Sequence, residues 1–268
     1  MRVILFSIGD FQVRSYGLVV ALAIMLAMGV AYYLAKGTTY RKHIPNMMFY
    51  VLIGAILVAR IWHVFFFQWD YYSKHLVEIP AIWNGGIAIQ GALVGGFIAA
   101  AIYARVARIS FWELADTMAP AIIFGQAIGR IACFLNGDAY GSPTGSSFGI
   151  VYPEGTMAYA EYGPQPLWPA EIWEGQWDFI VFAILLIMKN KTWPKGFLFL
   201  SYNILYAIGR FMLEFLRGDS PRYLFNWTAG QWTSVVVIVI SLVIMMIFTL
   251  RQKRKDPEDL SPKLEQIH

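Results

Sequence analysis

About seven apolar stretches dominate this chain of 268 residues, and they decide what it can fold into. A helix needs about 20 mostly apolar residues to cross a bilayer, because the hydrocarbon core is about 30 Å thick and each residue rises about 1.5 Å. Only 14% of the residues are charged, against about 25% in a soluble globular domain. We therefore expect an all-α membrane protein with about seven transmembrane helices.

The expected spans differ in how clearly they stand out. They cover residues 15–35, 47–67, 87–106, 117–135, 177–188, 197–216 and 231–250. The segment 177–188 is short and needs the residues before it to reach across. The segment 87–106 is rich in small residues, which let helix backbones approach closely, so we expect it among neighbouring helices. We predict one membrane domain over residues 1–250 and a charged cytoplasmic tail over residues 251–268.

The basic residues indicate how the chain is oriented. Most Lys and Arg side chains outside the spans lie in four segments: 36–46, 105–112, 189–195 and the tail. Cytoplasmic segments carry such an excess, so we expect the N-terminus outside and the C-terminus in the cytoplasm. The net charge of +4 is then a consequence of topology, and a nucleic-acid partner is not expected. Asp10 and Arg14 precede the first span, so no cleavable signal peptide is expected.

The longest segment on the expected outer side lies between the fourth and fifth spans, at residues 136–170. It is rich in Gly, Pro, Ser and Tyr, a composition typical of turns and short strands. We therefore predict a small extracytoplasmic head inserted there. Long ordered loops are uncommon and often functional.

Several charged residues lie inside the predicted spans, where an ionisable side chain usually faces a partner or a wet cavity. Glu214 follows Arg210 by four residues and precedes Arg217 by three, so we expect the three on one helical face. Arg130 and Arg210 are expected at the depth of the outer headgroups, where guanidinium groups bind phosphate. The alternative is a structural ion-pair network. For Arg60 the sequence favours neither a structural role nor a role in substrate binding.

The segments that carry these charges resemble the prolipoprotein diacylglyceryl transferases, a family of bacterial membrane enzymes. GRIACFLNGDAYG at 129–141 is similar to the family signature. Further similar segments follow the family order: RSYGL at 14–18, GAILVARIWHVFF at 54–66, GGIAIQGALVGG at 85–96, LADTMAPA at 114–121, PAEIWE at 169–174 and GRFMLEFLRGD at 209–219. The resemblance covers residues 14–219, which is most of the membrane domain.

The resemblance implies a reaction and its partners. The family transfers the diacylglyceryl group of phosphatidylglycerol to the cysteine thiol of the lipobox, at the end of a prolipoprotein signal peptide. The reaction forms a thioether and releases glycerol 1-phosphate. The resemblance also implies seven spans with a small head, a place in the bacterial cytoplasmic membrane, and no metal or organic cofactor.

The residues carried over from the family pattern are Tyr16, Arg60, Asp116, Arg130, Asn136, Gly141, Glu174, Arg210 and Glu214. The chain departs from the pattern at four positions: Gln90 in place of a histidine, Cys133 of an asparagine, Asp138 of a glutamate and Glu171 of a glutamine. Glutamine cannot act as a base, so the group that accepts the thiol proton stays open.

A free thiol with a pKa of about 8.5 needs help to react, and charge developing on the departing phosphate needs fixed positive partners. The predicted catalytic residues are Arg130 and Arg210 on the phosphate, Glu214 orienting an arginine, and Asp138 or Tyr16 handling the thiol proton. The predicted substrate-binding residues are Arg130, Arg210, Gln90, Asn136, Gly141 and Arg60. No metal ligands are predicted.

Other single residues are weaker candidates. His63 could be a base, but a packed or interfacial histidine is the simpler interpretation. Cys133 is best interpreted as a small buried hydrophobe, and as the single cysteine it excludes an intrachain disulfide. Glu174 and Asp178 either mark the interfacial start of the fifth span or belong to the site.

Two other kinds of function were weighed. A transporter of anionic or lipid-like solutes would also line a path with arginines, but transporters commonly have repeated halves, and no repeat is seen. An alcohol phosphatidyltransferase needs paired aspartates for metal, and an intramembrane protease needs a Gly-x-Ser-x-Gly or His–Glu motif. Neither pattern is evident in the sequence.

Overall fold

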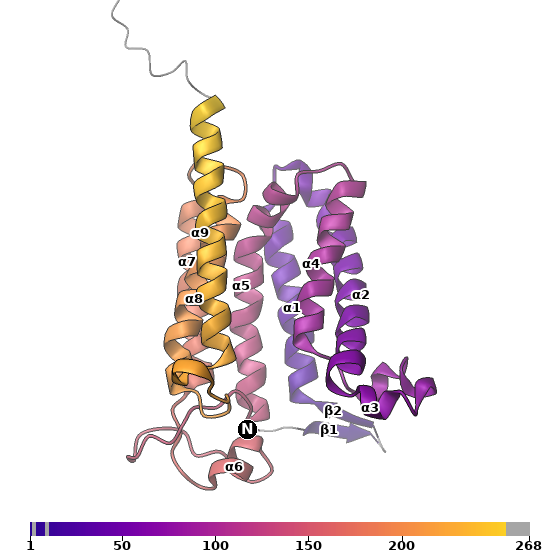
Figure 1. Ribbon diagram of the computed structural model, residues 1–268, viewed down its shortest axis with the longest axis vertical. Coiled ribbons are helices and arrows are strands. Elements are labelled where there is room, and N and C mark those ends of the chain that lie inside the picture. The colour runs from indigo at the N-terminus through magenta and orange to yellow at the C-terminus, as the bar shows by residue number, and fades with distance from the viewer. Residues whose placement is uncertain (2–3, 9–10, 256–268) are drawn as a thin grey trace, which may run out of the picture. The chain divides into compact units, whose positions relative to one another are not determined.

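The computed structural model describes residues 1, 4–8 and 11–255, which fold mainly into α-helices (Figure 1). The chain divides into two compact units. The first unit contains Met1–Ala27 and Met118–His268, and the second contains Met28–Thr117.

Five helical segments in the described residues are long and apolar enough to cross a membrane. They are α1 (Ser15–Leu34), the segment Thr39–Phe67 around α2, α4 (Ile89–Val106), α5 (Phe111–Asn136) and the segment Ala229–Arg251 of α9. This confirms the prediction of a mainly helical chain with several apolar helices.

Two predicted spans do not stand out by length and composition. They correspond to α7 (Ala170–Lys189) and α8 (Phe197–Leu213). α7 has 20 residues but carries three buried carboxylates, and α8 has only 17 residues. The count of seven therefore stays a prediction.

The first unit begins with a short antiparallel hairpin that the sequence analysis did not anticipate. It is formed by β1 (Ile4–Ile8) and β2 (Phe11–Arg14). β2 leads directly into α1. Within the described residues, β structure is therefore limited to this hairpin and isolated bridges.

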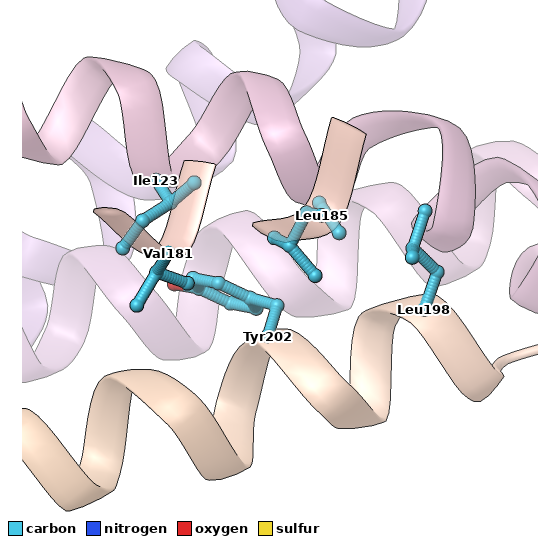
Figure 2. Close-up of a cluster of buried hydrophobic side chains, with 6 residues drawn as sticks. Ile123, Val181, Leu185, Leu198 and Tyr202 are labelled. Carbon is cyan, nitrogen blue, oxygen red and sulfur yellow. The ribbon is translucent and has the colours of Figure 1, made fainter. Parts of the chain in front are cut away.

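The main apolar core of the first unit lies where α5, α7 and α8 meet. Figure 2 shows Ile123 of α5, Val181 and Leu185 of α7, and Leu198 and Tyr202 of α8 gathered in one cluster. The Tyr202 hydroxyl donates a hydrogen bond to Oε1 of Gln126 at 3.0 Å, so the one polar tip in this cluster is satisfied. α9 (Ala229–Lys255) runs beside α8 (Figure 1).

Helix ends differ from the predicted spans in ways that matter for the site. α7 begins at Ala170 rather than at residue 177, so its acidic residues lie on the helix itself. α8 ends at Leu213 and passes into a 3-10 turn, Glu214–Leu216, after which Arg217 is extended. The prediction that Arg217 shares a helical face with Arg210 is therefore wrong. α9 runs to Lys255, so the first residues of the predicted tail are helical, and 256–268 lie outside the described residues.

The segment between α5 and α7 is a small folded unit built on turns, single bridges and one short helix, α6 (Met157–Tyr162). Thr156 caps α6 by accepting a hydrogen bond from the Tyr159 backbone N–H at 3.3 Å. The buried cluster of this segment consists of Tyr140, Tyr152, Ala158 and Leu167. It has its own small apolar core, as expected for a folded head rather than an open loop.

The second unit is organised around α2 (Ile44–Trp62) and α4, which pack closely along their lengths. α2 follows a 3-10 turn (Thr39–His43) and continues as a π-helical turn (His63–Phe67). The connection to α4 contains α3 (Trp69–Tyr72) and the 3-10 turns Leu76–Glu78 and Ile82–Asn84.

Glycines explain the close packing of α2 and α4. A Cβ on Gly95 would lie 2.2 Å from the carbonyl oxygen of Gly54, and a Cβ on Gly91 would lie 2.5 Å from that of Val58. A Cβ on the adjacent Gly96 would meet its nearest neighbour, Val51, at 3.5 Å, which is ordinary contact. The close approach of the two helices therefore requires glycine at positions 91 and 95 but not at position 96.

This difference predicts opposite effects for two neighbouring substitutions. Gly95→Ala should lower the free energy of unfolding by about 1–3 kcal/mol, because backbone must shift to admit the methyl group. Gly96→Ala should be neutral or stabilising by about 0.5–1 kcal/mol, since alanine is the better helix former. Thermal unfolding in detergent measures both, and a Gly95→Ala variant as stable as wild type would contradict the packing argument.

Candidate active site

Glu174 is the centre of a buried charge cluster in the first unit. Its Oε2 accepts from Nη2 of Arg130 at 2.7 Å, and its Oε1 accepts from Nη1 of Arg210 at 2.6 Å. Nη1 of Arg217 lies 3.5 Å from the same Oε1. Glu174 is 4% exposed, so one carboxylate from α7 joins guanidinium groups from α5, α8 and the segment after α8.

Glu214 holds the other side of Arg210. Its Oε2 lies 2.8 Å from Nη2 of Arg210, and its Oε1 accepts from the Thr228 hydroxyl at 2.9 Å. Thr228 and Gln231 also cap the start of α9 reciprocally, each bonding the other's backbone N–H through its side chain. The Glu214 carboxylate therefore lies at the N-terminus of α9, where the helix dipole favours negative charge. This geometry fits the predicted role of Glu214 in orienting an arginine.

Two glycines let the charged elements come together. A Cβ on Gly175 of α7 would lie 3.2 Å from Cβ of Arg130, and a Cβ on Gly209 of α8 would lie 2.0 Å from Nε1 of Trp177. That Nε1 donates to the Leu205 carbonyl at 3.0 Å, so the indole lies flat against the α8 backbone. A larger residue directly before Arg210 would displace Trp177 and with it the junction of α7 and α8.

A small cavity lies beside the cluster. It is lined by Arg130, Glu174, Trp177, Asp178, Tyr206, Gly209, Arg210 and Leu213. Its volume of about 10 Å³ is room for about one water molecule. Arg130 and Arg210 thus face the same hollow and bind the same carboxylate, but the hollow as it stands is too small for a phosphate group.

The head positions Arg217. Gly141 forms a bridge with Arg217, and the Ser142 backbone N–H donates to the Leu216 carbonyl at 2.7 Å. A Cβ on Gly141 would lie 2.2 Å from the Trp168 carbonyl oxygen, so only glycine fits this crossing. Asp219 then pairs with the Arg217 guanidinium at 2.6 and 2.7 Å. The geometry makes Gly141, predicted to bind substrate, a residue of close backbone packing.

A second cluster of polar side chains lies at the C-terminal end of α5. Nδ2 of Asn136 donates to Oδ2 of Asp138 at 3.1 Å, and the Cys133 thiol lies in hydrogen-bonding range of the Asp138 carboxyl. Tyr16, in the first turn of α1, lies within electrostatic range of Cys133, Asp138 and Arg130. Burial raises the pKa of Asp138 above its ordinary value, although Asn136 and Cys133 oppose the shift. Asn136, Asp138 and Tyr16 are thus near one another, as their predicted roles require.

Arg60 belongs to the second unit and is fully engaged there. Its guanidinium donates to the carbonyls of Glu78, Ile79, Gly85 and Gly86 at 2.7–2.9 Å and lies over the Tyr72 ring, 4.9 Å from its centroid. The side chain is 5% exposed. These contacts favour the structural interpretation of Arg60 over the predicted substrate-binding role, because backbone carbonyls already occupy its donors.

The remaining candidates also lie in the second unit. Gln90 is the second residue of α4 and is exposed. His63 packs edge-on against the rings of Phe67 and Tyr72, which fits a packed histidine. In the part of the chain that the structure describes, no group of three or more His, Cys, Asp or Glu side chains is placed to hold a metal ion.

Sequence reasoning underrated Glu174, Asp178 and Arg217. For the acidic pair the sequence left open an interfacial start of a span or a role in the site, and both carboxylates are buried and line the cavity. The available signal was their spacing of four residues, which puts them on one face of α7. Arg217 was predicted on one helical face with Arg210 and Glu214, because the end of α8 at Leu213 was not predicted.

The fold and the site define the class of the protein. Apolar helices long enough to cross a bilayer, with partly buried arginines paired to buried carboxylates where α5, α7 and α8 meet, make this a multi-pass membrane protein with an internal polar site. The chain belongs to the prolipoprotein diacylglyceryl transferase family, whose sequence model matches residues 3–247.

Individual relatives agree with this assignment. The chain is similar to the phosphatidylglycerol–prolipoprotein diacylglyceryl transferase of Acaryochloris marina, with 40% identity over 81% of this chain and 80% of the relative. The enzyme of the same name from Listeria innocua is 36% identical over 97% of this chain and 94% of the relative. That from Geobacillus kaustophilus is 35% identical over 90% of each.

The central place of Glu174 predicts a strong effect on stability. Glu174→Gln should lower the free energy of unfolding by about 3 kcal/mol, because it leaves partly buried guanidinium groups without the buried carboxylate they share. Adding Arg130→Gln should restore part of this loss, since one uncompensated charge is removed. Thermal unfolding in detergent measures the series.

Glu154→Gln is the matched control, because Glu154 is exposed and bonds only the exposed Tyr159 hydroxyl among the contacts described. It should change stability by less than about 0.5 kcal/mol. Equal effects of Glu174→Gln and Glu154→Gln would show that the cluster does not depend on Glu174.

Proposed function

We propose that this protein transfers the diacylglyceryl group of phosphatidylglycerol to the lipobox cysteine thiol of a prolipoprotein signal peptide. The products are a thioether and glycerol 1-phosphate. Family membership and the names of the relatives support this reaction. The observation that carries the assignment of the site is that Arg130 and Arg210 share one carboxylate and one cavity.

The arginines would act on the leaving phosphate. In the reaction the thiolate sulfur forms a bond to a glyceryl carbon, the bond from that carbon to the phosphate oxygen breaks, and the electron pair stays on that oxygen. Guanidinium groups already oriented by Glu174 and Glu214 stabilise that charge without reorganising at the moment of reaction. The phosphate must displace Glu174 from at least one arginine, since the present cavity of about 10 Å³ does not admit it.

Asp138 is the proposed acceptor of the thiol proton. Its raised pKa makes it a stronger base than an ordinary aspartate, and Asn136 orients its carboxyl at 3.1 Å. Tyr16 is the neighbouring hydroxyl group that can pass or hold a proton. Gln90 cannot take a proton. Its proposed role is to form hydrogen bonds with the glycerol of the lipid headgroup.

The proposed topology has seven spans, with α7 and α8 completing the five apolar segments. The arrangement of basic residues supports an outside N-terminus, a cytoplasmic C-terminus and an extracytoplasmic head at 136–170. α7 tolerates its three carboxylates within a span because they face arginines or a tyrosine rather than lipid. Residues 1–250 then form the membrane domain of an enzyme in the bacterial cytoplasmic membrane.

The transporter considered as an alternative finds no support in the family assignment. One experiment separates the two functions. The purified protein is incubated with phosphatidylglycerol and a peptide that contains a lipobox cysteine. A mass gain of one diacylglyceryl group on the cysteine supports the transferase, and lipid uptake without modification of the peptide contradicts it.

The arginine roles predict loss of this activity. Arg130→Ala and Arg210→Ala should each reduce transfer by at least about 100-fold, because the leaving phosphate loses a fixed positive partner. Mass spectrometry of the peptide measures the rate. Arg222→Ala is the control, since Arg222 is exposed and its side chain bonds only the backbone carbonyls of Phe215 and Asn226 among the contacts described. Wild-type turnover by a folded Arg210→Ala variant would refute the phosphate site.

The proposed base predicts a change in the pH profile. In the wild type kcat/KM should rise with pH through the raised pKa of Asp138, because only the ionised carboxylate accepts a proton. Asp138→Asn should lose about 100-fold or more near neutral pH and regain activity as the pH approaches the thiol pKa of about 8.5. A variant profile parallel to that of the wild type would exclude Asp138 as the base.

A further inference from the structure

Asp178 is a buried carboxylate that neither the ion pairs nor the proposed mechanism use. It is 2% exposed, and within the described part of the chain its Oδ2 has no hydrogen-bond partner. A buried, unpartnered carboxylate oxygen is costly, and such groups call for an explanation. It is four residues after Glu174 and lies on the same face of α7.

The surroundings of Asp178 are the phosphate site itself. It lines the cavity together with Arg130 of α5, Tyr206 and Arg210 of α8, and Glu174 of its own helix. Asp178 interacts electrostatically with Arg130, Glu174, Arg210, Tyr202 and Tyr206. Arginines therefore face Asp178 from both α5 and α8, tyrosines face it from α8, and the neighbouring carboxylate is on α7 itself.

The charges of the cluster do not favour an anion as they stand. Three guanidinium groups, those of Arg130, Arg210 and Arg217, face four carboxylates, those of Glu174, Asp178, Glu214 and Asp219. A lipid phosphodiester would add one more negative charge in a site shielded from water. An uncompensated buried charge is strongly unfavourable, so the bound state requires either loss of a carboxylate charge or an extra cation.

We infer that Asp178 is a further residue of the phosphate site, which takes up a proton when the lipid phosphodiester binds between Arg130 and Arg210. The inference rests on the proposed function. Glu174 contacts three arginines and keeps an arginine partner when the phosphate displaces it from one. Glu214 is held by Arg210, and Asp219 is held by Arg217. Asp178 is the carboxylate of this set with a buried oxygen that has neither a hydrogen bond nor an ion pair, and it lines the hollow.

The proton has two consequences for binding. It returns the site to the charge it had before the lipid entered, and it converts an acceptor into an O–H donor aimed at a phosphate oxygen. Because the bound state holds one more proton than the free state, raising the pH should weaken lipid binding. The limit is tenfold in Kd for each pH unit.

Calorimetry tests the inference. Phosphatidylglycerol in mixed micelles is titrated into the detergent-purified full chain in two buffers of different ionisation enthalpy, both at about pH 8.5, because only an ionised Asp178 can take up a full proton. The difference in binding heat gives the number of protons taken up per lipid bound. We expect about one for the wild type and about none for Asp178→Asn, whose amide donates a hydrogen bond without a proton from solution.

Asp70→Asn is the matched control, an exposed aspartate in the second unit, and should keep the wild-type proton uptake. Wild-type binding without proton uptake, or equal uptake by Asp178→Asn, overturns the inference while the proposed function stands. Failure of the wild type to bind phosphatidylglycerol overturns both. Should Asp178→Asn fail to fold, the wild-type proton count and the rise of its Kd with pH still decide the matter.

Discussion

Partly buried guanidinium groups need carboxylate partners in a medium of low dielectric, and this requirement organises the site. Arg130 and Arg210 lie on different helices, and neither is stable there without a counter-charge. Glu174 supplies it to both, at 2.7 and 2.6 Å, and thereby ties α5, α7 and α8 together at one level. The same ion pairs hold the guanidinium groups in fixed orientations, so one interaction serves both the packing of helices and the proposed binding of phosphate.

Several features around Glu174 allow the charged side chains to approach one another. Gly175 lets α5 come within contact of α7, and Gly209 leaves space for Trp177. The α9 N-terminus, capped by Thr228 and Gln231, receives Glu214. The head also contacts this cluster, because Gly141 forms a β-bridge with the extended chain at Arg217.

The sequence predicted the helices well where hydrophobicity alone decides them, as in α1, α4 and α9. It was less accurate for α7, since a hydropathy pattern counts Glu171, Glu174 and Asp178 against a span although all three are buried inside the protein. The end of α8 before Glu214 was missed for a similar reason. Charges spaced three or four residues apart predict a helix as far as the spacing continues. Only the contact with the head shows that the helix has ended before Arg217.

By itself, the sequence determined that this is a membrane protein whose arginines need charged partners. The length of an apolar segment and the free-energy cost of a charge within it can both be read from neighbouring residues. Its motifs also indicated the family. Only the tertiary structure decided which partner each arginine has, because Arg130, Glu174 and Arg210 are far apart along the chain. It likewise decided that Arg60 binds four backbone carbonyls and that Asp178 keeps an unpartnered oxygen beside the arginines. Such pairings depend on which helix faces meet, and no local pattern specifies that.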